Sequence, residues 1–147
     1  MRFVRINEDG SADEPVLLTE TAKEVCADTA KLYGKSGYTP PWVGYLCLIR
    51  ENILGTCCFK SAPVKGRVEI AYFTFPGNEG RGVATSMAAG LIKIALETDP
   101  DVKIFAQTIS EENPSTSILK KLGFKYTGEI IHPDGELVWE WELPHKQ

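Results

Sequence analysis

The sequence is poor in the side chains that bind metals and carry nucleophilic catalysis: it has only two histidines and four cysteines among 147 residues. The cysteines form no C-x-x-C pair, and neither histidine is close to a cysteine in the chain. Zinc needs four converging ligands, and no Cys-His or Ser-His-Asp arrangement is present, so we expect no metal. We interpret the cysteines as buried free thiols in a reducing, cytoplasmic environment. These six residues are Cys26, Cys47, Cys57, Cys58, His132 and His145.

Long hydrophobic runs and an excess of positive charge are also missing. The longest apolar runs, such as residues 44–49, have the length of a strand and cannot span a bilayer. Residues 1–3 lead into charge and not into an apolar signal segment, so we expect no secretion. The net charge is −4 without a basic stripe, which argues against nucleic acid as the main partner and agrees with a cationic amine as a ligand. With 43% hydrophobic residues, the chain is expected to form one domain over residues 1–147.

The strongest pattern in the chain lies between residues 68 and 96. Residues 68–75 are rich in Val, Ile, Tyr, Phe and Thr and end at Pro-Gly, which predicts a strand. From Gly80 onward, apolar residues recur at spacings of three and four, which predicts a helix. The glycine-rich segment 77–84 connects the two. It therefore forms a turn that leads directly into a helix N-terminus.

A turn of this kind is a binding site for phosphate groups. It leaves backbone N–H groups unpaired and directed into one concavity, with the positive end of the helix dipole behind them. Gly80 and Gly82 allow the backbone to approach an anion without an intervening Cβ. We therefore predict that residues 80–85 hold the phosphates of a cofactor.

Three designs of glycine turn can be compared with this one. A P-loop requires a lysine and a hydroxyl where Val83 and Ala84 stand. A dinucleotide-binding turn requires a third glycine or alanine where Thr85 stands, and an acidic residue at the end of the next strand; Asp99 and Asp101 come before that strand. The third design is the acyl-CoA turn, [Q/R]-x-x-G-x-[G/A], which the spacing fits best.

Two segments resemble the GNAT superfamily of N-acetyltransferases. Glu79-Gly80-Arg81-Gly82-Val83-Ala84 is similar to the acetyl-CoA turn of that family, and residues 112–124 (ENPSTSILKKLGF) resemble its second cofactor segment. Residues 43–142 follow the order of strands and helices in the family. Glu79 departs from the pattern, because Gln or Arg is usual there and a carboxylate would repel a pyrophosphate unless its side chain points away.

The resemblance implies a fold and a reaction. The fold would be α+β, with a mixed, mostly antiparallel sheet of six to seven strands, a splayed central strand pair and helices on both faces. The cofactor would be acetyl-CoA, and its acetyl group would pass by direct attack to an amine, carried by a small molecule or a peptide. Residues 8–42 would form the acceptor side. The implied cofactor-binding residues are Phe73, Thr74, Phe75, Gly80, Arg81, Gly82, Val83, Ala84, Thr85 and Asn113.

Glu69 is the best candidate for a catalytic base. It is the only acid in the apolar strand 68–75, where burial would raise its pKa. The alternative is an outward-facing residue or an ion pair with Arg67 or a lysine. A general acid is harder to find, because the second cofactor helix lacks the tyrosine that the family often carries, and Tyr126 lies beyond it. His132 is interpreted as a turn residue.

The alternative function is a non-catalytic CoA sensor or interaction domain with the same fold. Glu79 and the missing tyrosine favour it, because both depart from the catalytic pattern. The C-terminal strand could also pair across a homodimer through Val138, Trp139 and Trp141. Neither the acceptor nor the oligomeric state follows from a motif.

The remaining predictions concern secondary structure. Asn113 is expected to cap a helix with Pro114 at its first position, Gly34 to stop a helix, and the tail 144–147 to fray. The predicted strands are 2–7, 43–50, 53–60, 67–75, 102–109, 126–131 and 136–143, and the other predicted helix is 15–33.

Overall fold

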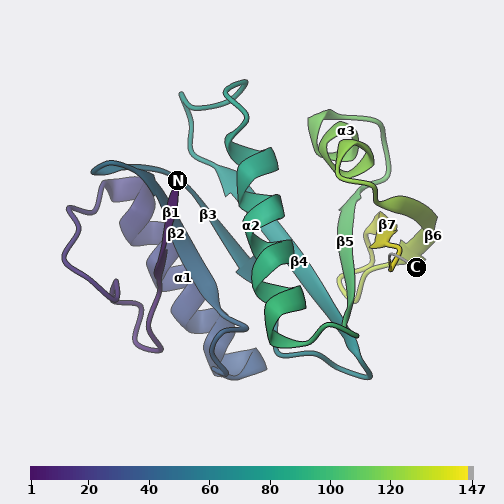
Figure 1. Ribbon diagram of the computed structural model, residues 1–147, viewed down its shortest axis with the longest axis horizontal. Coiled ribbons are helices and arrows are strands. Elements are labelled where there is room, and N and C mark those ends of the chain that lie inside the picture. The colour runs from purple at the N-terminus through teal and green to yellow at the C-terminus, as the bar shows by residue number, and fades with distance from the viewer. Residues whose placement is uncertain (146–147) are drawn as a thin grey trace.

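The computed structural model describes residues 1–145. Within them the chain forms one seven-stranded sheet and three helices (Figure 1). The elements in chain order are β1 (Arg2–Arg5), α1 (Glu20–Ser36), β2 (Gly44–Ile49), β3 (Asn52–Phe59), β4 (Arg67–Thr74), α2 (Val83–Thr98), β5 (Lys103–Ile109), α3 (Pro114–Lys121), β6 (Lys125–Ile131) and β7 (Leu137–Leu143). None of the helices in this part of the chain is long and apolar enough to cross a membrane.

The strand order is β1-β2-β3-β4-β5-β7-β6, and every neighbouring pair is antiparallel except β4 with β5. That parallel pair is joined through α2, as a parallel connection requires a crossover. In Figure 1, α1 lies behind the sheet and α2 in front of it, whereas α3 lies at the upper end of β5. The predicted α+β fold, with seven strands and helices on both faces, is therefore confirmed.

The central strands β4 and β5 separate along their length. They pair only where residues 67–69 of β4 face residues 103–105 of β5. Beyond Glu69 the two strands diverge, β4 toward α2 and β5 toward α3 (Figure 1). This is the splayed pair that the resemblance implies, and we call the opening between the strands the fork.

Side chains of β4 alternate between the two faces of the sheet. Val68 and Ile70 are buried on the face that α2 covers. Glu69 and Ala71 point to the opposite face, because successive strand residues alternate. Ala71 pairs with Cys58, whose Cβ lies beside Gly44 and the side chains of α1. One strand thus contributes to both sides of the sheet.

Two helices begin later than predicted. Helix α1 starts at Glu20 and not at residue 15, because the Thr19 hydroxyl accepts a hydrogen bond from the Ala22 N–H and so caps the helix. It also continues through Gly34 to Ser36. Helix α2 starts at Val83 and not at Gly80, because Gly82, with φ 76°, is still in the left-handed conformation of the turn.

The C-terminal region corrects two further predictions. The hairpin β6–β7 is confirmed, but β7 lies between β5 and β6, so it has no free edge for pairing across a dimer. The tail does not fray at His145, whose ring nitrogen lies 2.9 Å from the Val102 carbonyl oxygen. Residues 146–147, the rest of the predicted frayed tail, lie outside the described residues.

A glycine in β3 fixes how closely β4 and α2 approach it. A Cβ at Gly55 would lie 2.6 Å from the Phe73 carbonyl oxygen and 3.1 Å from the Met87 sulfur. We expect Gly55→Ala to lower the free energy of unfolding by about 1–3 kcal/mol, measured by urea denaturation, because the backbone of β4 must shift. As a control, Gly34→Ala in α1 meets nothing within 4 Å and should raise stability by up to about 1 kcal/mol. Equal stability of Gly55→Ala and wild type would contradict the close approach.

Candidate functional site

The fork contains an inner cavity of about 270 Å³. Its walls are the diverging parts of β4 (residues 70–72) and β5 (residues 106–109), and α3 closes it with Asn113, Ser115 and Leu119. An outer cavity of about 520 Å³ adjoins it, since Tyr72 and Ser115 line both. The outer cavity extends along residues 72–74 to the glycine turn and the start of α2. Together they form a passage from a helix N-terminus into the sheet.

The glycine turn presents free backbone donors to the outer cavity. Gly80 and Gly82 both have φ 76°, a conformation that favours glycine. Gly82 is the N-cap of α2, and no side chain in residues 1–145 caps this helix end. The N–H groups of residues 83–85 are therefore available at the positive end of the helix dipole. This geometry suits a phosphate group.

Glu79, the departure from the family pattern, folds back onto its own turn. Its two carboxylate oxygens accept hydrogen bonds from the Gly77 N–H at 3.1 and 3.3 Å. Glu79 nevertheless lines the outer cavity, so its negative charge stays close to the backbone donors. The side chain thus occupies one donor of the turn and opposes an anion at the others.

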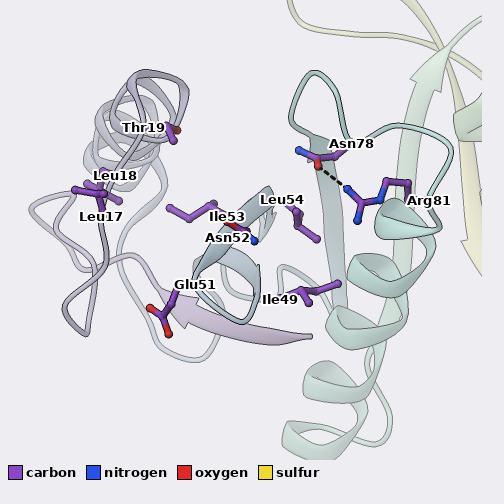
Figure 2. A pocket seen from close by; sticks show the side chains of 10 residues that line it. All are labelled: Leu17, Leu18, Thr19, Ile49, Glu51, Asn52, Ile53, Leu54, Asn78 and Arg81. Carbon is purple, nitrogen blue, oxygen red and sulfur yellow. Dashed lines mark hydrogen bonds between the residues drawn. The ribbon is translucent and has the colours of Figure 1, made fainter.

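Arg81 lies on the other side of the turn. Its guanidinium donates a hydrogen bond of 3.1 Å to the Asn78 side-chain oxygen, and both side chains line a separate cavity of about 770 Å³. Figure 2 shows this cavity between the turn, the β2–β3 hairpin and residues 17–19. The Arg81 side chain is not in the lining of the outer cavity.

The backbone of β4 is used alternately by β3 and by the fork. The Phe75 N–H donates to the Leu54 carbonyl, and the Glu69 carbonyl accepts from the Lys60 N–H, so odd-numbered residues bond to β3. The backbone groups of Tyr72 and Thr74 therefore face the fork. Two of the predicted residues of β4 line the outer cavity: Thr74 can contact a ligand there through its backbone, and Phe73 through its side chain, which is 49% exposed. The side chain of Phe75 is buried.

Asn113 places the start of α3 at the inner cavity. Its side-chain oxygen accepts from the Thr116 N–H at 3.1 Å, and the Thr116 hydroxyl accepts from the Asn113 N–H at 3.0 Å. This reciprocal capping confirms the predicted helix start, with Pro114 in the first turn. Asn113 also lines the cavity. The predicted cofactor residues in the outer cavity are Phe73, Thr74, Gly80, Gly82, Val83, Ala84 and Thr85.

Glu69 is half-buried on the sheet face opposite α2. Burial raises the pKa of its carboxyl group, and the charge of Glu140 raises it further, whereas Lys60 and His132 lower it. The alternative of an ion pair with Arg67 is not found, because Arg67 pairs with Glu140 and its guanidinium lies 4.2 Å from the centre of the Phe105 ring. No ion pair to Glu69 occurs in the described residues. Its carboxyl group is thus half-buried without an ion partner among these residues, a setting that is common for functional carboxyl groups.

Two residues close to the candidate site were not recognised as such from the sequence. His132 lies in the β6–β7 turn, as predicted, with its Nδ1 3.1 Å from an Asp134 carboxylate oxygen, and in its protonated form it lowers the pKa of Glu69. Tyr72 lines both cavities of the passage. Burial raises its pKa to about 12, and the side chain of Ser115 acts in the opposite direction and lowers it. The alternation along β4 places Tyr72 on the face of Ile70, which was the only signal available in the sequence.

The sequence model of a family described as the acetyltransferase (GNAT) domain matches residues 11–125. A search of curated proteins found no match. Among solved structures, a protein of Acinetobacter baylyi assigned as an acetyltransferase has 19% identity and a TM-score of 0.67, over 97% of this chain and 91% of its own.

Two other similar structures carry more specific names. Spermidine N-acetyltransferase SpeG of Vibrio cholerae, as its F149A mutant, has 15% identity and a TM-score of 0.65, over 86% of this chain and 77% of its own. A Bacillus anthracis protein assigned as a streptothricin acetyltransferase was solved with acetyl coenzyme A; it has 18% identity and a TM-score of 0.63, over 78% and 68% of the two chains. At such identities the likeness shows the fold alone.

The raised pKa of Glu69 predicts a pH-dependent effect on stability. The folded state holds this proton more tightly than the unfolded chain, so the associated stability is present at low pH and is lost as pH rises through the folded pKa. We expect Glu69→Gln to gain stability relative to wild type between about pH 4 and about pH 7, because glutamine does not ionise. Urea denaturation of both proteins at the two pH values measures it. A difference that does not change with pH would contradict the assigned environment.

Proposed function

Since the chain belongs to the GNAT family of acetyltransferases, we propose that it transfers an acetyl group from acetyl-CoA to the nitrogen of an amine. The observation that carries this proposal is the passage from the N-terminus of α2 into the fork, whose inner end reaches the strand that bears Glu69. A long ligand with phosphates at one end and a reactive group at the other fits such a passage. Acetyl-CoA has this form.

In this proposal the backbone holds most of the cofactor. The N–H groups of residues 83–85 bind the pyrophosphate, with Gly80 and Gly82 giving close access. The pantetheine arm runs along the free edge of β4 at Thr74 and passes Asn113. The acetyl carbonyl oxygen then meets a backbone N–H group that faces the fork. Along β4, Tyr72 offers the next such group after that of Ile70. A donor at that position stabilises the negative charge that develops when the amine attacks.

The acceptor amine approaches from the face that carries Glu69. The Glu140 carboxylate, which pairs with Arg67, raises the pKa of Glu69 and so lies near it there, and the Glu69 carboxylate favours a cationic amine. Glu69, acting directly or through a water molecule, removes the proton of the ammonium group so that the neutral nitrogen can attack. Similarity in fold to a spermidine N-acetyltransferase supports an amine as the acceptor class.

The cofactor assignment is tested by thermal denaturation with acetyl-CoA, CoA, ATP and NAD at matched concentrations. A ligand at about one hundred times its dissociation constant stabilises by about 2.7 kcal/mol, or roughly 5 to 10 °C for this chain length. We expect shifts with acetyl-CoA and CoA alone. A shift with ATP or NAD instead would overturn the assignment. Release of CoA with a series of cationic amines then separates an enzyme from a CoA sensor, which would bind acetyl-CoA but turn over none.

The same assay tests the role of Glu69. We expect Glu69→Gln to bind acetyl-CoA as wild type does and to lower turnover by about 100-fold, because general base catalysis contributes about that much or more. Glu24→Gln, at an exposed position of α1, is the matched control and should leave turnover unchanged. Wild-type turnover in Glu69→Gln would exclude the base.

Glu79 should weaken the binding of the cofactor. We expect Glu79→Gln to lower the dissociation constant of acetyl-CoA about fivefold, since it removes a charge worth about 1 kcal/mol beside the pyrophosphate and keeps an oxygen for the Gly77 N–H. Calorimetric titration measures the change, again with Glu24→Gln as the control. An unchanged or weaker affinity would mean that the Glu79 charge does not act on the ligand.

A further inference from the structure

Tyr72 stands at the junction of the two cavities. Tyr72 and Ser115 are the two residues that line both, one from β4 and the other from the first turn of α3. The two side chains also interact with each other, which opposes the rise in the Tyr72 pKa. A ligand that passes from the outer to the inner cavity must therefore pass beside this pair.

Transfer of an acyl group from a thioester leaves a thiolate in that passage. The C–S bond breaks, its electron pair stays on the sulfur, and a C–N bond forms at the carbonyl carbon. The amine gives up its proton on the Glu69 side. The sulfur then carries a full negative charge inside a partly apolar cavity, where an unpaired charge is costly. A hydrogen-bond donor beside the sulfur would remove much of this cost.

Five side chains that line the inner cavity carry a hydrogen-bond donor: Tyr72, Gln107, Thr108, Asn113 and Ser115. The Thr108 hydroxyl accepts a 3.1 Å hydrogen bond from the Trp141 ring and the Asn113 oxygen caps α3, which fixes both side chains in positions that line the inner cavity alone. Gln107 follows Ala106, which is buried, and so points to the other sheet face. Tyr72 and Ser115 stand where a ligand enters the inner cavity, and the phenol is the more acidic donor and has the longer reach.

We propose that the Tyr72 hydroxyl donates a hydrogen bond to the sulfur of CoA as the thiolate leaves. This rests on the proposed function, since it requires CoA in the passage. Tyr72 holds its proton throughout: its pKa is about 12, whereas an ordinary thiol has a pKa of about 8.5, so the thiolate finally takes its proton from water.

The test compares the affinities of CoA and acetyl-CoA, because only CoA has an ionisable thiol. Dissociation constants are measured by calorimetry between about pH 7 and about pH 9.5, on either side of the ordinary thiol pKa, for wild type, Tyr72→Phe and Tyr126→Phe. Protein groups that titrate in this range change both dissociation constants equally, so their effect cancels in the ratio of the two constants. Tyr126, an exposed tyrosine of β6 outside both cavities, is the matched control.

In wild type, we expect CoA to gain affinity relative to acetyl-CoA as pH rises through the thiol pKa. In Tyr72→Phe that gain should be about tenfold smaller, because a hydrogen bond to a charged group is lost. Tyr126→Phe should follow wild type. An identical gain in Tyr72→Phe, or an equal loss of affinity for both ligands, would overturn the proposal.

Two further outcomes remain distinct. If neither ligand binds wild type, the proposed function fails and Tyr72 with it. If Tyr72→Phe does not fold, the wild-type protein still decides the matter: ultraviolet absorption of the thiolate gives the thiol pKa of bound CoA. A bound pKa below that of free CoA is expected, and a pKa that is equal or higher would overturn the proposal.

Discussion

The parting of β4 and β5 after Glu69 is the constraint on which the rest of the structure depends. Two parallel strands in a sheet normally satisfy each other's backbone groups. Here the pairing ends after three residues on each strand, so the inner edge of β4 keeps free donors and acceptors. Such groups are tolerated only where water or a ligand can reach them. The inner cavity provides that access, and the same groups become available to a bound molecule.

The elements around the fork hold it open. Gly55 lets the carbonyl of Phe73 and the side chain of Met87 pack against β3, so β4 is held on its other edge and cannot close onto β5. The capping box of Asn113 and Thr116 fixes the start of α3 over the opening. The turn that follows β4 places the N-terminus of α2 at the outer end. A change in any of these contacts would alter the width of the passage without touching a reacting group.

The sequence predicted the parts of this arrangement that depend on local patterns. The order of strands and helices along the chain, the Asn113 cap and the C-terminal hairpin follow from periodicity and turn residues, and they were correct. Helix α1 was placed too early because a proline is a weaker signal than the Thr19 side chain that caps the helix. Two other features depend on tertiary packing. The Arg81 side chain points away from the outer cavity, and Tyr72 lies beside Ser115, which is 43 positions later in the chain. No local pattern encodes them.

Alternation along one strand separates the two halves of the proposed reaction. Glu69 points to one face of β4, and Tyr72, three residues on, points to the other, beside α3. The backbone N–H of Tyr72 faces the fork between them. In the proposed reaction the amine loses its proton on one face, and the sulfur gains negative charge on the other. The groups that act on these two atoms would therefore lie a few residues apart on one rigid strand. Such a strand holds reacting groups more precisely than a loop does. The carboxylate and the phenol are also kept apart by the sheet itself, so the base cannot bind the donor in place of the substrate.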